Sequence, residues 1–380
     1  MLVIIFLISR ILLLLCSFVA QKTIPYSGFF PLKELLPTFL LPTWLSAFAN
    51  FDGLHYVTIA KQGYSQYEQA FFPLYPLLLY LISFITRNEL VSGIVISNGS
   101  LLTALFVFQK ILSLKKIDIK QTTWFYILLL SFPTAFFFGA VYTEGLFFLL
   151  FSLSLYFLYK KNYYLASLFA SLTSLTRLIG VFLIIPFFFH FLSEHKGKLK
   201  NFRLLALSFK PMLLSPLLGL LGYMTYLWIS TGDPLIFFNS QPKFGANRST
   251  HLIFLPQVFY RYIKIIFTAA HDSQWGIALV EVLIFTLVLS VICFDLYTLI
   301  KEVRKNYFLI GINIFSFANL ILPTLTGTFS SIPRYALFSF SFFLFLAQIK
   351  SNTLKVGIAL LFGVSQAILL GLFIQGYFVG

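Results

Sequence analysis

Residues 50–76 read NFDGLHYVTIAKQGYSQYEQAFFPLYP and interrupt a chain that otherwise consists mostly of long apolar runs. The stretch holds Asp52, His55, Lys61 and Glu68 together with several tyrosines and prolines. Around it, hydrophobic runs long enough to cross ~30 Å of hydrocarbon recur with short polar breaks, which is typical of helices and not of the alternating strands of a barrel. The sequence therefore predicts an all-α polytopic membrane protein whose polar chemistry is concentrated in this stretch.

Composition supports the same class. Of the 380 residues, 59% are hydrophobic and only 10% are charged, and the mean hydropathy is +0.90, outside the range of soluble domains. We expect residues 1–380 to form one integral membrane domain. The run 2–20 lacks the basic start and cleavage site of a signal peptide, so we interpret it as a retained span. Cys16 and Cys293 fall within expected spans, which leaves no disulfide framework and no cysteine metal site.

Positive charge is concentrated in the short breaks between apolar runs. Sixteen of the 27 Lys and Arg residues lie at 110–120, 160–161, 196–210, 301–305 and 350–355. Placing all five breaks in the cytoplasm satisfies the positive-inside rule and explains the net charge of +15 without a nucleic-acid partner. About eleven spans are then expected, near 2–20, 90–109, 122–141, 145–159, 162–176, 178–193, 211–230, 275–300, 307–323, 335–348 and 356–375.

One further apolar run, 71–85, conflicts with this topology if it also crosses the membrane. The run is short, contains Pro73 and Pro76 and is flanked by polar residues, so we assign it as an interfacial or re-entrant helix. Residues 21–89 and 231–274 then form loops on the extracytoplasmic side of the cell membrane. Within the second loop, 251–267 predicts another interfacial helix, because Arg261 and Lys264 sit beside aromatic residues.

Three of the motif residues are expected on one helix face. Asp52, His55 and Tyr56 are three and four residues apart, a spacing that makes neighbours on a helix. An acid and a histidine side by side can carry proton chemistry. The alternative is that Asp52 caps a helix that Gly63 ends. Both interpretations can hold together, since a cap can also face a cleft.

Three charged residues stand near the outer ends of expected spans. Glu144 lies in an otherwise apolar hairpin, where an acid held at depth costs up to ~2.5–3.5 kcal/mol and therefore usually marks a partner or a site; the alternative is a solvated tip. Arg177 and Arg334 have the planar guanidinium that suits a lipid phosphate, or they anchor helix ends at the headgroups. Arg10, midway along the first span, either snorkels or pairs with an acid.

With these residues in view, the chain resembles the PIG-V type of GPI mannosyltransferase and its prokaryotic relatives, within the GT-C superfamily of glycosyltransferases that use lipid-phosphate sugars. The resemblance rests on several blocks in family order, with Phe51 where relatives usually have Trp. These are FDGLHYVTIAKQGY (51–64), AFFPLYPLL (70–78), FPTAFFFGAVYTEGLFFLL (132–150), SLTSLTRLIG (171–180), GDPLIFF (232–238) and IPRYAL (332–337).

The resemblance implies a GT-C type bundle and an inverting transfer of mannose, or a similar hexose, from a polyprenyl-phosphate sugar to a glycolipid or other hydroxyl acceptor. Asp52 would be the general base, Glu144 would orient the acceptor or share that role, and His55 would position Asp52 or the sugar. The lipid phosphate would be held by Arg334, with Arg177 or Arg261 second. These roles are expectations.

No metal is required by this chemistry, although Asp52 and Glu144 leave a divalent ion open if they converge. The histidines lack metal-ligand spacing, and the chain has no nucleotide-binding loop, which disfavours a nucleotide-sugar donor. The main alternative function is a transporter or flippase of lipid-linked saccharides, which would place charges in mid-span and show internal repeats. A third alternative, an acyltransferase, would need a nucleophile system that does not stand out.

Overall fold

The computed structural model of the chain describes residues 1–28, 30–195, 202–245, 248–303 and 306–379, with backbone only at 202–211. Every regular element in these ranges is helical, which confirms the predicted all-α class. The cationic breaks at 196–210 and 301–305 lie wholly or partly outside the described side chains.

Six helices in the described part of the chain are long and apolar enough to cross a membrane. The protein is therefore membrane-embedded by the length and composition of its helices. They are α1 (Leu2–Thr23), α5 (Glu89–Leu114), α10 (Phe202–Thr231), α13 (Ser273–Lys301), α14 with the adjoining turn η8 (Tyr307–Ile321 and Leu322–Thr326) and α17 (Asn352–Ile374).

The remaining α-helices are shorter than a full span. α7 and α8 begin and end near the predicted spans 145–159 and 162–176, whereas α6, α9 and α16 cover only part of the predicted 122–141, 178–193 and 335–348. The predicted count of about eleven spans is not confirmed. These helices are α2 (Thr43–Ser46), α3 (Asp52–Gln62), α4 (Leu74–Thr86), α6 (Ile119–Ser131), α7 (Glu144–Tyr159), α8 (Tyr163–Ser174), α9 (Ile184–Glu194), α11 (Ile236–Asn239), α12 (Leu255–Thr268), α15 (Ile332–Tyr335) and α16 (Phe340–Ala347).

Short 3₁₀ turns prolong or join several of these helices. They tighten the chain at the ends of α-helices. The turns are η1 (Lys33–Phe39), η2 (Ala47–Ala49), η3 (Glu68–Ala70), η4 (Ala135–Phe138), η5 (Leu178–Leu183), η7 (Gln241–Phe244) and η9 (Ala336–Phe338).

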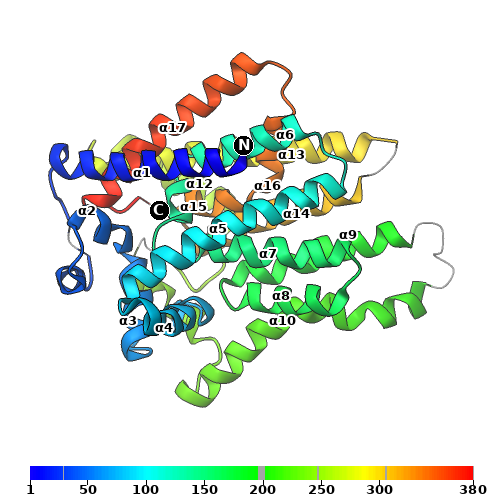
Figure 1. The fold of residues 1–380 in the computed structure, drawn as a ribbon, viewed down its shortest axis with the longest axis horizontal. Coiled ribbons are helices and arrows are strands. Elements are labelled where there is room, and N and C mark those ends of the chain that lie inside the picture. Colours follow the sequence, from blue (N-terminus) through cyan, green and yellow to red (C-terminus); the bar gives the residue numbers. More distant parts are fainter. Residues whose placement is uncertain (29, 196–201, 246–247, 304–305, 380) are drawn as a thin grey trace.

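Figure 1 shows that the long helices run side by side and that the two ends of the bundle differ. The α5–α6 and α7–α8 connections lie at one end, whereas α2, α3 and α4 lie at the other. The cationic break 110–120 spans the first connection and the helix ends beside it, and 160–161 lies in the second connection. The motif 50–76 is therefore at the end opposite to these two breaks, as the charge pattern predicts.

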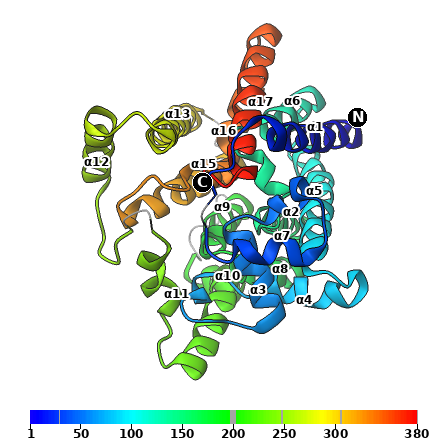
Figure 2. The same ribbon diagram turned by 90° about the vertical axis from the view of Figure 1, so that its left-hand side faces the viewer.

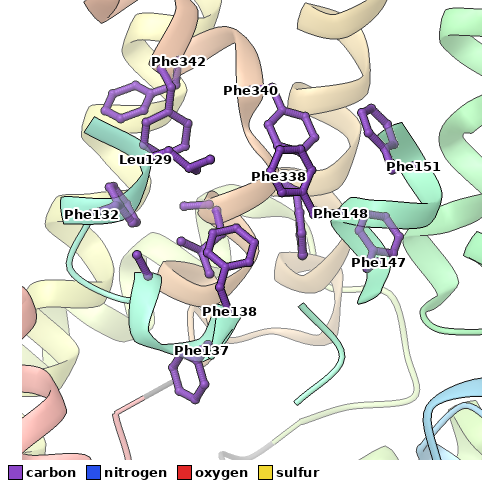
Figure 3. Close-up of a cluster of buried hydrophobic side chains, with 14 of the residues drawn as sticks. Leu129, Phe132, Phe137, Phe138, Phe147, Phe148, Phe151, Phe338, Phe340 and Phe342 are labelled. Atoms are coloured by element: carbon purple, nitrogen blue, oxygen red, sulfur yellow. The ribbon is translucent and has the colours of Figure 1, made fainter. Parts of the chain in front are cut away.

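The core of the bundle is built from phenylalanine rings. α5 packs along α7, and α16 packs against α6 and α14. Rings from these elements meet in the middle, where Phe151 lies 5.0 Å from Phe340 and Phe147 lies 4.5 Å from Phe338 between centroids (Figure 3). Both pairs are tilted, and favourable aromatic pairs at such distances add about 0.5–1.5 kcal/mol each beyond area burial. This core fixes the starts of α7 and α15, which carry two of the predicted site residues.

Two predicted interfacial segments are helices in the structure. α4 is 13 residues long, or about 20 Å, which is too short to cross the hydrocarbon alone. α12 buries Val258 and Tyr262 but exposes Tyr260, Ile263 and Phe267, and it lies on the flank of the molecule (Figure 2). Their position in the membrane interface stays a prediction.

Arg10 follows neither of the two predicted arrangements. Its Nε donates to Ser9 Oγ at 3.2 Å, and its guanidinium lies 5.6 Å from the centroid of the Phe6 ring. The atoms Nη1 and Nη2 are buried without a hydrogen-bond partner among the described residues. In the part of the chain that the structure describes, Arg10 therefore pairs with no acid, and its buried Nη1 and Nη2 do not snorkel to the surface.

The side of the membrane that the motif faces can be measured by labelling. In a variant without Cys16 and Cys293, a cysteine at Gln66, which is exposed, should react with an impermeant maleimide added from outside the cell. A cysteine at Lys120, exposed at the opposite end, should react only after the membrane is opened. Reaction of the Gln66 site only from the cytoplasm would reverse the orientation.

Candidate functional site

The start of α3 holds an unusual backbone conformation. Phe51 is the N-cap residue with φ 57° and ψ −119° and makes no side-chain cap. A non-glycine residue in such a region costs about 1–3 kcal/mol and persists only where its surroundings impose it. Here the Phe51 ring packs on Phe30, Phe373 and Phe378 at centroid distances of 4.8, 5.8 and 5.4 Å. Asp52 is therefore the first residue of the helix and not its cap.

The preceding residue is fixed from two sides. The Asn50 side chain donates to the carbonyl of Phe373 at 2.8 Å. The Asn50 carbonyl accepts from the Tyr142 hydroxyl at 2.8 Å. Since Tyr142 stands two residues before Glu144, these bonds tie the start of α3 to the start of α7.

Four predicted residues form one alternating row of charges. Arg334 Nη1 donates to Asp52 Oδ2 at 2.7 Å. Arg334 Nε lies 3.3 Å from Glu144 Oε1, an ion-pair distance without hydrogen-bond geometry. Arg177 Nη1 donates to the same Oε1 and lies 3.2 Å from Thr143 Oγ1. We name Asp52, Arg334, Glu144 and Arg177 the charge row; its two acids and two bases sum to zero.

The charge row runs from the surface into the protein. The exposed fraction of the side chain is 25% for Asp52, 12% for Arg334, 0% for Glu144 and 9% for Arg177. Buried charges need partners, because leaving one unpaired is far more costly than exposing it. Asp52 is thus the most accessible member. The Glu144 carboxylate has no exposed surface of its own and contacts the two arginines, which are slightly exposed.

Residues far apart in sequence meet in this row. Asp52 begins α3, Glu144 begins α7 with its carboxylate at a helix N-terminus, Arg177 precedes η5 and Arg334 lies in α15. An acid in the first helical turn is favoured by the helix dipole. The sequence alternative of Glu144 as a solvated tip is wrong, because its side chain is fully buried.

Aromatic rings surround both guanidinium groups. The Arg177 guanidinium lies 4.8 Å from the Tyr335 ring centroid. The Arg334 guanidinium lies 5.5 Å from that of Phe137 and 5.3 Å from that of Tyr142. Cation–π contacts at these distances hold a guanidinium in place without neutralising it. The rings therefore fix the directions in which the two arginines point.

The ionisation of Asp52 follows from its neighbours. Burial raises the pKa of its carboxyl, but the charge and hydrogen bond of Arg334 outweigh burial, so that the net pKa lies below its ordinary value. Burial lowers the pKa of Arg334, but the negative charges of Asp52 and Glu144 raise it by more, so the net pKa lies above its ordinary value. At neutral pH this pair is ionised.

His55 belongs to a neighbouring pair. Its Nδ1 lies 2.9 Å from Glu68 Oε1, and its ring stacks on Phe71 at 4.9 Å. Glu68 Oε2 also accepts from the backbone N–H of Ser65 at 3.0 Å. The His55–Glu68 pair thus closes the loop after α3.

Arg261 lies elsewhere. It donates from α12 to the carbonyl of Gly327 at 3.0 Å, and Gly327 has a left-handed φ of 92°. A Cβ at Gly327 would lie 2.5 Å from Arg261 Nη1, so glycine is needed at this contact. Arg261 therefore supports the segment that leads to Arg334 and has no place in the charge row.

The two acids do converge, but on a guanidinium. Arg334 lies between Asp52 and Glu144, at the place where a cation would bind. Across the described residues, no group of three His, Cys, Asp or Glu side chains is arranged to hold a metal ion.

Several site residues carry no sequence signal of their own. Asn50, Tyr142 and Glu68 act through hydrogen bonds to residues elsewhere in the sequence. Their presence in the motif blocks 50–76 and 132–150 is the only indication that the sequence offers.

Comparisons with protein-family models, with curated proteins and with solved structures give no match to this chain. The resemblance drawn from the motif blocks stays a prediction.

Proposed function

We propose that this chain is an integral-membrane glycosyltransferase of the GT-C type, related to the PIG-V mannosyltransferases, with its site on the extracytoplasmic side. It would move mannose or a similar hexose from a polyprenyl-phosphate sugar to a hydroxyl of a membrane-anchored or exported acceptor. The observation that supports this most is the end of the charge row. There an accessible, ionised carboxylate stands beside a guanidinium suited to phosphate, as displacement of a phosphate by a hydroxyl requires.

The acceptor oxygen forms a bond to the anomeric carbon from the face opposite the phosphate, and the bond between that carbon and the phosphate oxygen breaks. The bonding electrons stay with polyprenyl phosphate, and the acceptor proton moves to Asp52. Arg334 stabilises the charge that develops on the phosphate. The configuration at the anomeric carbon is inverted.

Arg334 couples binding of the donor phosphate to the basicity of Asp52. In the free protein its bond to Asp52 lowers the pKa of that carboxyl, which makes Asp52 a weak base. A phosphate that attracts Arg334 away from Asp52 would raise the Asp52 pKa and strengthen the base once the donor is bound. The base would thus be activated by the donor.

Glu144 and Arg177 have a supporting role in this proposal. Glu144 is fully buried and contacts both guanidinium groups, so it acts as a positioning residue for Arg334. His55 holds the loop after α3 through Glu68. Asp52 is the only acid of the charge row that can reach an acceptor directly.

The test is a transfer assay with purified protein in lipid nanodiscs. Radiolabelled polyprenyl-phosphate mannose is added with glycolipid and peptide acceptors. We expect labelled product and one released polyprenyl phosphate per sugar transferred. Labelled donor that stays intact with every acceptor class and every polyprenyl-phosphate hexose would contradict the proposal.

A second candidate, transport of a lipid-linked saccharide, is favoured by buried ionisable residues in the spanning helices. Glu281 and Asp295 lie buried on α13, and Lys355 lies buried on α17. Their contacts are local: Glu281 accepts from Tyr262 at 2.6 Å, and Asp295 from Asn313 at 2.7 Å. In sealed proteoliposomes a transporter would move the labelled lipid across the bilayer unchanged, whereas the transferase releases polyprenyl phosphate.

A further inference from the structure

A fifth charge lies beside the charge row. Arg248 follows η7 and is half-buried. Its Nη2 lies 3.2 Å from Ser331 Oγ and its Nη1 lies 3.2 Å from Gln241 Oε1. Among the described residues no carboxylate lies within ion-pair distance of Arg248, so its partners are neutral oxygens. The positive charge of Arg248 nevertheless contributes to lowering the pKa of Asp52.

The position of Arg248 is fixed relative to Arg334. The backbone N–H of Ser249 donates to the Thr326 carbonyl at 2.9 Å, which ties this segment to the one that carries Ser331. The N–H of Arg334 donates to the Ser331 carbonyl at 3.0 Å. Ser331 thus contacts Arg248 through its side chain and Arg334 through its backbone. The two guanidinium groups are held next to one segment.

Arg248 differs from the arginines of the charge row in having no carboxylate partner among the described residues. Arg334 and Arg177 are already matched by Asp52 and Glu144, so the charge row offers no net charge to an anion. A phosphodiester brings one negative charge, and the released phosphate monoester approaches two. The neutral oxygens around Arg248 can be exchanged for phosphate oxygens, because an anionic phosphate attracts the guanidinium charge and can accept two of its N–H bonds at once.

On the basis of the proposed function, we infer that Arg248 is the residue that first receives the phosphate of the polyprenyl-linked donor. Arg248 supplies the positive charge that the neutral charge row lacks. Arg334 then exchanges its bond to Asp52 for a bond to the same phosphate. The ligand chemistry is a phosphate ester at the membrane surface. The lipid that carries it is a polyprenyl chain and not a bulk phospholipid.

Binding of polyprenyl phosphate without sugar tests this inference separately from catalysis. Equilibrium binding of the radiolabelled lipid is measured to protein in phosphatidylcholine nanodiscs. Arg248→Gln should weaken binding about 10- to 100-fold, the loss of one hydrogen-bonded charge. Arg248→Lys keeps the charge and should retain most of the affinity. Arg248→Ala is a second neutral variant if the glutamine variant fails to fold.

Two controls separate charge from structure. Ser331→Ala removes the bond to Arg248 without removing the cation and should bind as the wild type does. Lys243→Gln removes another cation of the same segment, which lies 5.4 Å from the Tyr67 ring centroid, and should also bind normally. If Ser331→Ala weakened binding as much as Arg248→Gln, Arg248 would act by supporting the loop, and the inference would be wrong.

The binding experiment also separates failure of the inference from failure of the proposed function. Normal binding by Arg248→Gln would remove Arg248 from the donor site and leave the proposed function standing. Failure of the wild type to bind polyprenyl phosphate would overturn both the inference and the proposed donor. Competition by phosphatidylglycerol or inorganic phosphate at equal concentration would identify an unspecific anion site and overturn the inference alone.

Discussion

Asp52→Asn should reduce sugar transfer ~10²–10⁴-fold, the usual contribution of a general base. The asparagine keeps the size of the side chain and can still accept a hydrogen bond from Arg334. It can no longer take the acceptor proton. Because the Asp52 side chain is a quarter exposed, water can solvate the guanidinium, and the free energy of unfolding should change by about 1 kcal/mol or less. Initial rates and thermal midpoints of the purified variant measure both quantities.

The control for Asp52 is the pH dependence of the wild type. The ionised carboxylate is the active form, and its pKa in the free protein lies below the ordinary value of 3.8. Activity due to Asp52 is therefore present above that value and lost as pH falls through the lowered pKa. The kcat/KM profile should show no acidic limb from this group near neutral pH. Full transfer by Asp52→Asn would exclude Asp52 from the mechanism.

The long helices could be predicted because hydropathy is a local property. The runs 90–109 and 275–300 match α5 and α13 closely, and the short run 71–85 is the short helix α4. A stretch of apolar residues without a charge has few alternatives to a buried helix, whatever the rest of the chain does. The class and the helix positions follow from this alone.

The number of spans could not be derived in the same way. The run 122–141 is divided in the structure into α6 and the 3₁₀ turn η4, with Pro133 between them. Likewise 335–348 is divided into the 3₁₀ turn η9 and the eight-residue α16. Such segments are apolar because neighbouring helices cover them, and hydropathy does not distinguish burial in protein from burial in lipid.

The four members of the charge row could be predicted, together with His55 and Arg261, which lie outside it, but the pairing of the four could not. Asp52, Glu144, Arg177 and Arg334 stood out as charges between apolar runs. The contact between Arg334 and Asp52 joins residues 282 positions apart and forms only in the folded chain. It depends on the strained backbone of Phe51, which cannot be recognised from the residue type. Arg248 was missed because nothing in its local sequence separates it from a solvated loop arginine.

Glu144→Gln should destabilise the protein by about 3–5 kcal/mol, the cost of breaking a buried ion pair from one side. Glu144 is fully buried and contacts both Arg177 and Arg334. Without its charge, Arg177 loses its carboxylate partner. Arg334 is then left with Asp52 alone. The thermal midpoint in detergent should fall clearly, and transfer should fall with it because Arg334 is no longer held in place.

The matched control is the ion pair between Lys161 and Glu194 at the opposite end of the bundle, whose side chains are 62% and 34% exposed. Glu194→Gln should leave the midpoint unchanged, since water replaces the lost partner. Adding Arg177→Met to Glu144→Gln removes both buried charges and should recover much of the stability. Recovery of stability without recovery of transfer would assign Glu144 to the positioning of Arg334. If Glu144→Gln were as stable as Glu194→Gln, the charge row would not hold these four segments together.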